Sequence, residues 1–442
     1  MERTSSEWWR TEQASADWRA KARAGADEWV PPHSGVPFWA AIVFTGILLF
    51  SPQAYFPALE SVRPALIPAV IGIGAYLVDR FGHGAPLFMR TRILWIVGAF
   101  AGWAMLTVPF SIWPGGSLAF LTGQYFKTLA IFWLLSHTAV TILRLRQMAW
   151  SLSIMAIGLA ILTLNNYASG VFIDQAANQD RVVGNEGALT KNPNDLALMI
   201  NIIIPLTIAL LLSSVRPAIR ITLFGMLGLE ALTVILTFSR GGFLTLGGIL
   251  LVYMWKLRRR AERVWIYGVL VLALFCLPLL PSTYFDRMST IIHTEADSTG
   301  SAGERWTDMT LAARHVLSSP ITGAGVGMNV LAMNEARGGG WRPVHNVFLE
   351  LIIDLGLPGV IGFIWLLVSC LKSTVEVQRR AAGVQEMKGL VHLAEGIQVS
   401  LLAFILAAMF HPVSYHPYFY YIAALALAAH AVSRSIRTVC HS

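Results

Sequence analysis

The stretch HNVFLELIIDLGLPGVIGFIWLLVSC, residues 345–370, decides the fold. Its first two residues are polar, and the rest is almost entirely apolar apart from Glu350 and Asp354. A helix needs roughly 20 apolar residues to cross the hydrocarbon core of a bilayer. The stretch therefore predicts a transmembrane helix with a polar entrance.

Apolar segments of the same kind recur along the whole chain. Of its 442 residues, 55% are hydrophobic and 13% are charged, whereas soluble domains have about 25% charged residues. Such a chain cannot cover its surface with charge, so we expect lipid to surround it. We predict an all-α polytopic membrane protein, with a single transmembrane domain over residues 37–442. About twelve spans are expected, at residues 38–56, 64–79, 93–110, 117–136, 148–165, 195–213, 219–238, 241–257, 264–281, 346–371, 394–411 and 417–432.

Basic residues gather in the short connections between these segments. The net charge is +8, but clusters in this position are typical of topology signals and of contacts with anionic membrane lipids, not of nucleic-acid binding. If both termini lie in the cytoplasm, every strong basic cluster obeys the positive-inside rule. These clusters are Arg80, Arg90 and Arg92; Arg144 and Arg146; Arg216 and Arg220; residues 256–263; residues 378–388; and Arg434 with Arg437.

Two connections are long, residues 166–194 and residues 282–344, and this topology sends both to the outer side. Loops beyond about 15 residues in a compact protein are usually functional or disordered. In the larger one, RWTDMTLAARHVLSSP, residues 305–320, has apolar residues at helical spacing. We therefore expect a folded helical cap on the outer surface of the membrane.

The first 36 residues lack the pattern of a signal peptide and are expected to form a cytoplasmic segment. Its tryptophans and basic residues leave two interpretations open, an interfacial helix on the membrane and a partly disordered tail. Cys276, Cys370 and Cys440 have no spacing typical of a disulfide framework or a metal site. We interpret them as structural and predict no metal ligands.

Arg240 stands in LTFSRGGF, residues 236–243, between two apolar segments. A guanidinium at membrane depth costs about 2.5 to 3.5 kcal/mol on insertion scales, and the adjacent Gly241 and Gly242 allow a ligand or backbone to approach closely. One interpretation is an interfacial anchor in a tight turn. The other is a phosphate site, because the arginine fork matches phosphate oxygens.

His345 and Asn346 stand where the chain re-enters the membrane, and Asn346, Glu350 and Asp354 share one helix face through their four-residue spacing. A histidine at an interface is often structural. Here Arg240, Arg305 and Arg342 can converge on the same side, and nearby cations favour the neutral imidazole that a general base requires. The GxGxG pattern of Gly323, Gly325 and Gly327 follows no strand, so it predicts a turn packed on membrane helices and not a nucleotide site.

Further ionisable residues lie in or near the apolar segments, where they are functional hypotheses by default. They are Lys127, Lys191, Asp195 and Glu230. Lys127 could hold a pyrophosphate or could pair with Glu230, and the sequence does not choose between these. His411 and His416, beside Pro412 and Pro417 in FHPVSYHPYF, are interpreted as part of a short outer turn.

Four motifs, in this order, resemble the O-antigen ligase and polymerase superfamily of bacterial surface polysaccharide assembly. They are NPND (192–195) with the preceding RVVGNEG, SRGG (239–242), ERW (304–306) followed by SSPITGAGVG, and HNVFLELIIDLGLPGVIG (345–362). The resemblance covers roughly residues 180–370. It implies a glycosyltransferase C-like membrane fold in the bacterial inner membrane and a glycan donor carried on undecaprenyl pyrophosphate. It also implies transfer in the periplasm without a metal or other cofactor.

The resemblance also assigns roles to residues. In the family, an arginine after the SR junction and an arginine in the large loop are thought to grip the donor pyrophosphate, while the histidine of the HN motif handles the acceptor hydroxyl. These roles fall on Arg240, Arg305 and His345 in turn. Further side chains are expected to help: Arg342, Lys191 and Lys127 at the pyrophosphate, and Asn346, Glu350 and Asn194 in support.

The favoured function is therefore ligation of a lipid-linked glycan to an acceptor hydroxyl, such as one on a glycan or on lipid A core. A single direct displacement would invert the anomeric configuration. Two alternatives share the donor chemistry: an O-antigen or exopolysaccharide polymerase that joins lipid-linked repeat units, and a protein O-oligosaccharyltransferase. A secondary transporter is the alternative from another class, but transporters usually show related halves and midplane polar sites, whereas here the polar residues gather at one interface.

Overall fold

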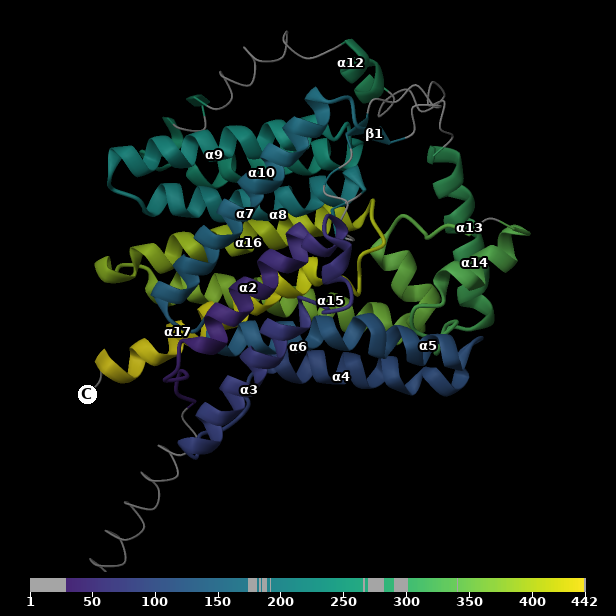
Figure 1. The fold of residues 1–442 in the computed structure, drawn as a ribbon, viewed down its shortest axis with the longest axis horizontal. Helices are drawn as coiled ribbons and strands as arrows, with labels where there is room; N and C mark the ends of the chain where they lie inside the picture. The colour runs from purple at the N-terminus through teal and green to yellow at the C-terminus, as the bar shows by residue number, and fades with distance from the viewer. Residues whose placement is uncertain are drawn as a thin grey trace, which may run out of the picture.

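A computed structural model describes residues 29–173, 181–182, 184, 189–190, 192–264, 267–268, 282–289, 301–339 and 341–440, and within these the chain is mostly helical (Figure 1). The helices are α2 (Val36–Phe50), α3 (Leu66–Gly82), α4 (Arg92–Leu106), α5 (Pro114–Phe120), α6 (Phe126–Thr138), α7 (Ile142–Ala168), α8 (Pro193–Ser213), α9 (Pro217–Leu236), α10 (Arg240–Leu257), α12 (Ser282–Ser289), α13 (Ser301–Ser318), α14 (Asn329–Arg337), α15 (Val347–Ala381), α16 (Lys388–Ala408) and α17 (Pro417–Cys440). A π-helical turn, Leu121–Tyr125, joins α5 to α6. Strands β1 (Phe172–Ile173) and β2 (Arg181–Val182) pair antiparallel, with Phe172 opposite Val182.

Eight helical segments of the described chain are long and apolar enough to cross a membrane. They are Val36–Ala54, Arg92–Phe110, Pro114–Thr138, Ile142–Ala168, Pro193–Ser213, Pro217–Leu236, Val347–Ala381 and Gln385–Ala408. The predicted all-α, multi-pass membrane protein is confirmed. The count of twelve stays a prediction: α3, α10 and α17 lie beside these spans in the bundle, and most of the predicted segment 264–281 lies outside the described residues.

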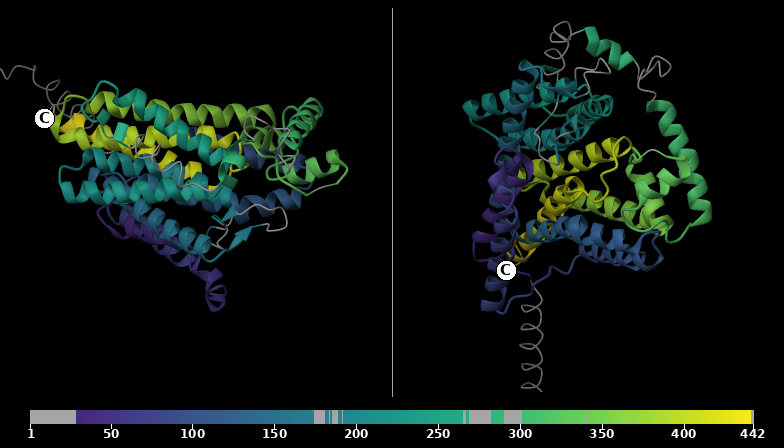
Figure 2. Two further views of the ribbon diagram at one scale, coloured as in Figure 1. Left: turned by 90° about the horizontal axis from the view of Figure 1, so that it is seen from above. Right: turned by 45° about the vertical axis from the view of Figure 1, so that its right-hand side comes forward.

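The two ends of the bundle differ in what covers them. Helices α13 and α14 lie across one end, at the right of Figure 1 and again in both views of Figure 2, and we call this the cap end. The last helix, α17, runs to the opposite end. The helix expected over residues 305–320 is confirmed, because α13 spans Ser301–Ser318.

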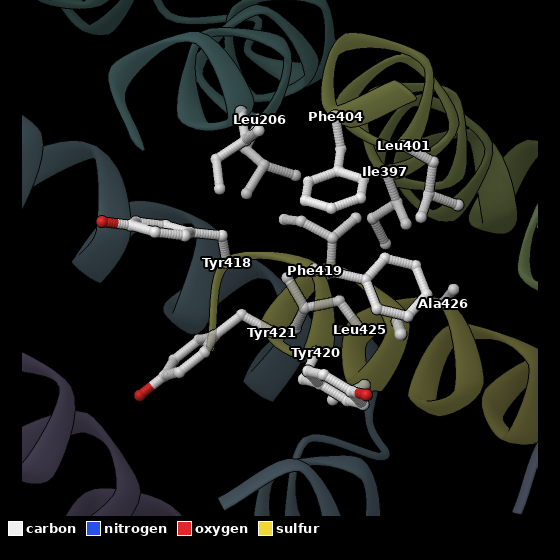
Figure 3. Packing of buried hydrophobic residues seen from close by; sticks show 14 of the residues in the cluster. Leu206, Ile397, Leu401, Phe404, Tyr418, Phe419, Tyr420, Tyr421, Leu425 and Ala426 are labelled. Atoms are coloured by element: carbon white, nitrogen blue, oxygen red, sulfur yellow. The ribbon is translucent and has the colours of Figure 1, made fainter. Parts of the chain in front are cut away.

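Helix α16 packs against both α8 and α17. Phe404 of α16 and Phe419 of α17 face each other with ring centroids 5.3 Å apart, beside Leu206 of α8 (Figure 3). A Cβ atom on Gly396 would lie only 2.7 Å from the carbonyl oxygen of Pro205, so α16 packs directly on α8. Apolar burial drives little helix association inside lipid, and small residues that allow close packing take its place.

Helix α15 is broken in its first third. Gly356 has φ 65° and ψ −166°, and Pro358 follows. The indole Nε1 of Trp103 donates to the carbonyl of Leu355 at 2.9 Å, which satisfies an acceptor next to the break. The first part of α15, residues 347–355, is therefore a separate helical piece, and we call it the entrance helix.

Backbone hydrogen bonds join the entrance helix to the chain that precedes α14. The amides of Ala324 and Gly325 donate to the carbonyls of Ile353 and Asp354 at 2.7 and 2.9 Å. Gly323, Gly325 and Gly327 all have positive φ, and a Cβ on Gly327 would lie 2.4 Å from the ring of Phe120. The prediction of a turn packed on membrane helices is confirmed for this glycine pattern.

Candidate functional site

The NPND and SRGG motifs touch through a single asparagine. The Ser239 hydroxyl donates to Oδ1 of Asn194 at 2.8 Å and accepts from the Gly242 amide at 3.1 Å, which caps the start of α10. Arg181, in β2, donates to the same Oδ1 at 2.7 Å. Two motifs that lie 45 residues apart are thus fixed to each other.

Arg240 is the first residue of α10 and is half-buried. The start of a helix carries a partial positive charge and unpaired amides, so a guanidinium placed there gives a site that favours anions. The preceding Phe238 has φ 51°, a backbone region that bulky residues rarely adopt. Such strain clusters at functional sites, where the surrounding structure holds it in place.

The glycines of SRGG let α10 begin in a crowded place. A Cβ on Gly242 would lie 2.6 Å from the Cβ of Ala197 in α8, and one on Gly241 would lie 3.1 Å from the Cβ of Phe410. Phe410 belongs to the connection between α16 and α17, residues 409–416, which we call the 409–416 turn. The start of α10 is therefore packed between α8 and this turn.

The HN motif contacts the same turn from another side. Asn346 caps α15 by accepting from the amides of Phe348 and Leu349 at 2.8 and 3.2 Å, and its Nδ2 donates to the carbonyl of Met409 at 3.4 Å. His345, which comes just before this cap, is half-buried. Gly241 and Asn346 thus contact adjacent residues of the 409–416 turn, so Arg240 and His345 both stand beside it.

The predicted polar face of α15 holds the site together. Buried Glu350 accepts from the amide of Ser414 in the 409–416 turn at 3.0 Å. Asp354, one turn further on, accepts from the amide of Gly327 at 3.0 Å and from Nδ2 of Asn329 at 3.2 Å. Through their four-residue spacing, Glu350 and Asp354 therefore connect the 409–416 turn to the start of α14.

Tyr415 of the 409–416 turn is buried among aromatic rings. The Tyr415 ring lies 5.1 Å from that of Phe120 and 5.3 Å from that of Tyr125, centroid to centroid, and burial raises the pKa of Tyr415. Burial lowers the pKa of His416 to about 4. The Tyr418 hydroxyl donates to the carbonyl of Leu189, two residues before Lys191. The prediction that His411 and His416 belong to a turn is confirmed.

The other predicted donor-binding residues have different surroundings. Arg342 lies 3.8 Å from Asp308 of α13, a carboxylate that also accepts from Nε and Nη2 of Arg337 at 2.9 and 2.7 Å. Arg305 lies in α13, but its side chain is outside the described residues, as is all of Lys191. These geometries leave the predicted roles of Arg305, Arg342 and Lys191 as hypotheses.

Lys127 is exposed on α6, and Glu230 is buried on α9. The Glu230 carboxylate accepts from the Thr207 hydroxyl at 2.8 Å. Among the described residues, Lys127 and Glu230 form no ion pair with each other. An ion pair with Glu230 therefore does not explain why a lysine occurs at position 127.

Three residues of the site were not predicted from the sequence: Arg181, Met409 and Phe410. Arg181 lies in the RVVGNEG stretch of the resemblance but was not selected as a site residue. For Met409 and Phe410, the sequence predicted only a nearby turn, from the prolines that follow them. Gly241 was the available clue, because a glycine at the start of a helix indicates a close neighbour.

A comparison with known protein families finds a match in this chain. Residues 221–364 match the protein-family model described as O-Antigen ligase. The match runs from α9 into α15 and includes SRGG, α13 and the HN motif. It confirms the resemblance to the O-antigen ligase and polymerase superfamily. No curated protein matches the chain.

Proposed function

From the O-antigen ligase region at residues 221–364, we propose that this protein moves a glycan from undecaprenyl pyrophosphate to an acceptor hydroxyl. The transfer takes place at the periplasmic face of the bacterial inner membrane, with both termini of the chain in the cytoplasm. The observation that carries the proposal is the shared contact with the 409–416 turn, where Gly241 packs on Phe410 and Asn346 bonds to Met409. It brings a cation and an imidazole to one end of the bundle.

Arg240 is the proposed ligand of the donor pyrophosphate. Displacement of the lipid pyrophosphate from the anomeric carbon builds negative charge on the leaving oxygens. A guanidinium held at a helix start stabilises that charge without having to reorganise as the charge develops. Ser239 and Asn194 support the proposal, since their hydrogen bond fixes the position from which the Arg240 side chain extends. Arg305, Arg342, Lys191 and Lys127 are the further proposed cations.

His345 is the proposed general base. A sugar hydroxyl is a poor nucleophile, and a neutral imidazole within hydrogen-bond reach can remove its proton as the new glycosidic bond forms. Asn346 supports this role, because its cap and its bond to Met409 fix the backbone on one side of His345. One displacement on the face opposite the leaving group gives a product of inverted anomeric configuration.

The acceptor defines the function within the family. We favour a ligase that transfers a finished glycan to lipid A core or to another final acceptor. A polymerase would use a second lipid-linked glycan, and a protein O-oligosaccharyltransferase would use a hydroxyl on a protein. A secondary transporter would form no new bond.

Reconstitution in proteoliposomes tests the proposal. Full-length protein is supplied with a glycan on undecaprenyl pyrophosphate and, in separate reactions, with lipid A core, with more lipid-linked glycan or with an unfolded acceptor protein. Release of undecaprenyl pyrophosphate together with a glycosylated lipid A core supports the ligase. Elongated lipid-linked glycan, glycosylated protein or uptake of glycan without bond formation would each replace it with the corresponding alternative.

Variants test the two side chains. We expect Arg240→Ala and His345→Ala each to lower the transfer rate by about 100-fold or more. Arg146→Ala is the matched control, because Arg146 is an exposed arginine on α7 near the opposite end. Normal turnover by His345→Ala protein would remove the general-base assignment, while the product analysis would still decide the reaction.

A further inference from the structure

The chain just before α2 is bound to the opposite end of the bundle. The carboxylate of Asp79, near the end of α3, accepts from the amides of His33 and Ser34 at 3.3 and 3.1 Å. Arg80 is fully buried and donates to the carbonyl of Val30 at 2.7 Å. Arg144 of α7 donates to the carbonyl of Ser34 at 3.1 Å. Residues 29–35, which we call the N-terminal strap, are thus held along the end of α3.

Two histidines flank the Asp79 carboxylate. The Nδ1 atoms of His33 and His83 lie 3.9 Å from Oδ2 and Oδ1 of Asp79, respectively. The two imidazole rings are stacked, with centroids 4.1 Å apart and an interplanar angle of 20°. One ligand atom from each of the three residues can be chosen so that all lie within 4.8 Å of one another. Among the described residues, no other group of this kind occurs.

The types of the three side chains and their hydrogen bonds fit metal binding. Two imidazole nitrogens and a carboxylate oxygen are a ligand set that suits zinc and its neighbours among the divalent transition metals. Metal-binding side chains usually have a second hydrogen bond that orients them. Here two backbone amides orient the Asp79 carboxylate, and His83 Nδ1 lies 2.8 Å from the Asp79 carbonyl oxygen. That contact leaves Nε2 of His83 as the nitrogen available to an ion.

The three side chains differ in their exposure to solvent. Asp79 has only 5% of its side chain exposed, whereas His33 and His83 have 58% and 51%. A carboxylate fixed by the fold therefore stands between two rings that are exposed at the surface. Metal–nitrogen bonds are about 2.0 to 2.1 Å long, so both rings would move to bind an ion, and their exposure leaves room for this.

We propose that His33, Asp79 and His83 bind one divalent transition-metal ion of the zinc class. The ion ties the N-terminal strap to α3, with water completing its coordination. The site lies at the opposite end of the bundle from Arg240 and His345, so it acts on the position of the N-terminal segment and takes no part in the proposed transfer chemistry. It does not depend on the proposed function.

Cobalt provides a direct test, because protein-bound Co²⁺ absorbs visible light. Full-length, tag-free protein in detergent is stripped with a chelator and titrated with Co²⁺ alone, and then Zn²⁺ is added to displace it. We expect one Co²⁺ per chain at this site. His33→Ala and His83→Ala should each weaken Co²⁺ binding by more than about 100-fold. Loss of a residue that only supports a metal ligand weakens binding by up to about 100-fold, so a larger loss indicates a direct ligand. His315→Ala, on α13 at the cap end, is the control and should bind normally.

Hydrogen exchange supplies a second readout that does not depend on colour. Zn²⁺ should slow amide exchange in residues 29–36 of the wild type and leave His83→Ala unchanged. Because both rings are exposed, the variants should keep the wild-type melting temperature without metal, which separates lost ligands from lost folding. Asp79→Asn serves as a third ligand variant. No Co²⁺ binding by the wild type, or equal binding by the wild type and both histidine variants, would overturn the proposal.

Discussion

At the opposite end of the bundle, Arg80 is fully buried, donates to the carbonyl of Val30 and lies over the Trp29 ring at 4.8 Å. At the cap end, Arg240 is half-buried at the start of a helix, and the hydrogen bonds that fix its backbone come from Ser239 and Asn194. The Arg80 side chain is buried and contacts the N-terminal strap, whereas Arg240 is half-buried and follows directly on the Ser239 cap. Burial and the identity of the holding groups, not charge alone, therefore separate a structural cation from a candidate ligand-binding one.

The largest expected effects on transfer rate and melting temperature come from replacing each of the two arginines separately by alanine. Arg240→Ala should lower the transfer rate by about 100- to 1,000-fold and lower the melting temperature less than Arg80→Ala does, because Arg240 is half-buried and Arg80 fully buried. Arg80→Ala should lower the melting temperature, because it removes buried contacts with the N-terminal strap, and leave the rate per folded molecule nearly unchanged. Rates in proteoliposomes and melting curves in detergent check both. The opposite pattern would break the comparison.

The buried histidine His416 makes the stability of the cap end depend on pH. Burial lowers the pKa of His416 at the cap end from 6.5 to about 4. As pH falls below 6.5, the unfolded chain takes up this proton while the folded protein does not, so folding stability falls until about pH 4. The loss from this residue is up to about 2 kcal/mol between pH 7 and pH 5. Melting temperatures should therefore depend less on pH in His416→Gln protein, and an unchanged slope would contradict the burial of the imidazole.

The link between NPND and SRGG sharpens the comparison further. Asn194→Ala and Ser239→Ala should each slow transfer, and the double variant should lose less than the two effects combined, with a coupling energy of about 1 kcal/mol. Ser153 and Thr207 are the control pair, because their hydroxyls are 2.8 Å apart in the middle of the bundle. Their coupling should show in stability and not in rate. Additive rate effects for Asn194 and Ser239 would mean that their contact does not position Arg240.

The smallest effect compares one helix cap from each end. Thr141 caps α7 at the opposite end by accepting from the Arg144 amide at 3.1 Å, as Asn346 caps α15. Replacing either by alanine should cost about 1 kcal/mol of stability, but only Asn346→Ala should also slow transfer. Asn346→Asp keeps the cap and removes the donor to Met409, so its rate isolates that contact. Equal rates for the two alanine variants would show that the cap beside His345 has no special role.

The fold could be predicted from local patterns, because apolar length and helical spacing are properties of short segments. Helix α13, the glycine turn and the shared face of Asn346, Glu350 and Asp354 were all predictable for that reason. The contact between Gly241 and Phe410 was not predictable, because it depends on how helices that are distant in the sequence pack together. The glycine itself is its only indication in the sequence.

The histidine cluster shows the same limit. Asp79 and His83 are four residues apart and share a helix face, which is a usable signal. His33 joins them only because Arg80 and Arg144 hold the N-terminal strap beside α3, and nothing in its local sequence indicates this.

The break at Gly356 has a mechanical consequence. The entrance helix is hydrogen-bonded to the chain before α14 through Ile353 and Asp354, and it carries Asn346 and Glu350, which bind the 409–416 turn. Because α15 is interrupted at Gly356, the direction of the entrance helix is set by these contacts and not by the axis of the rest of α15.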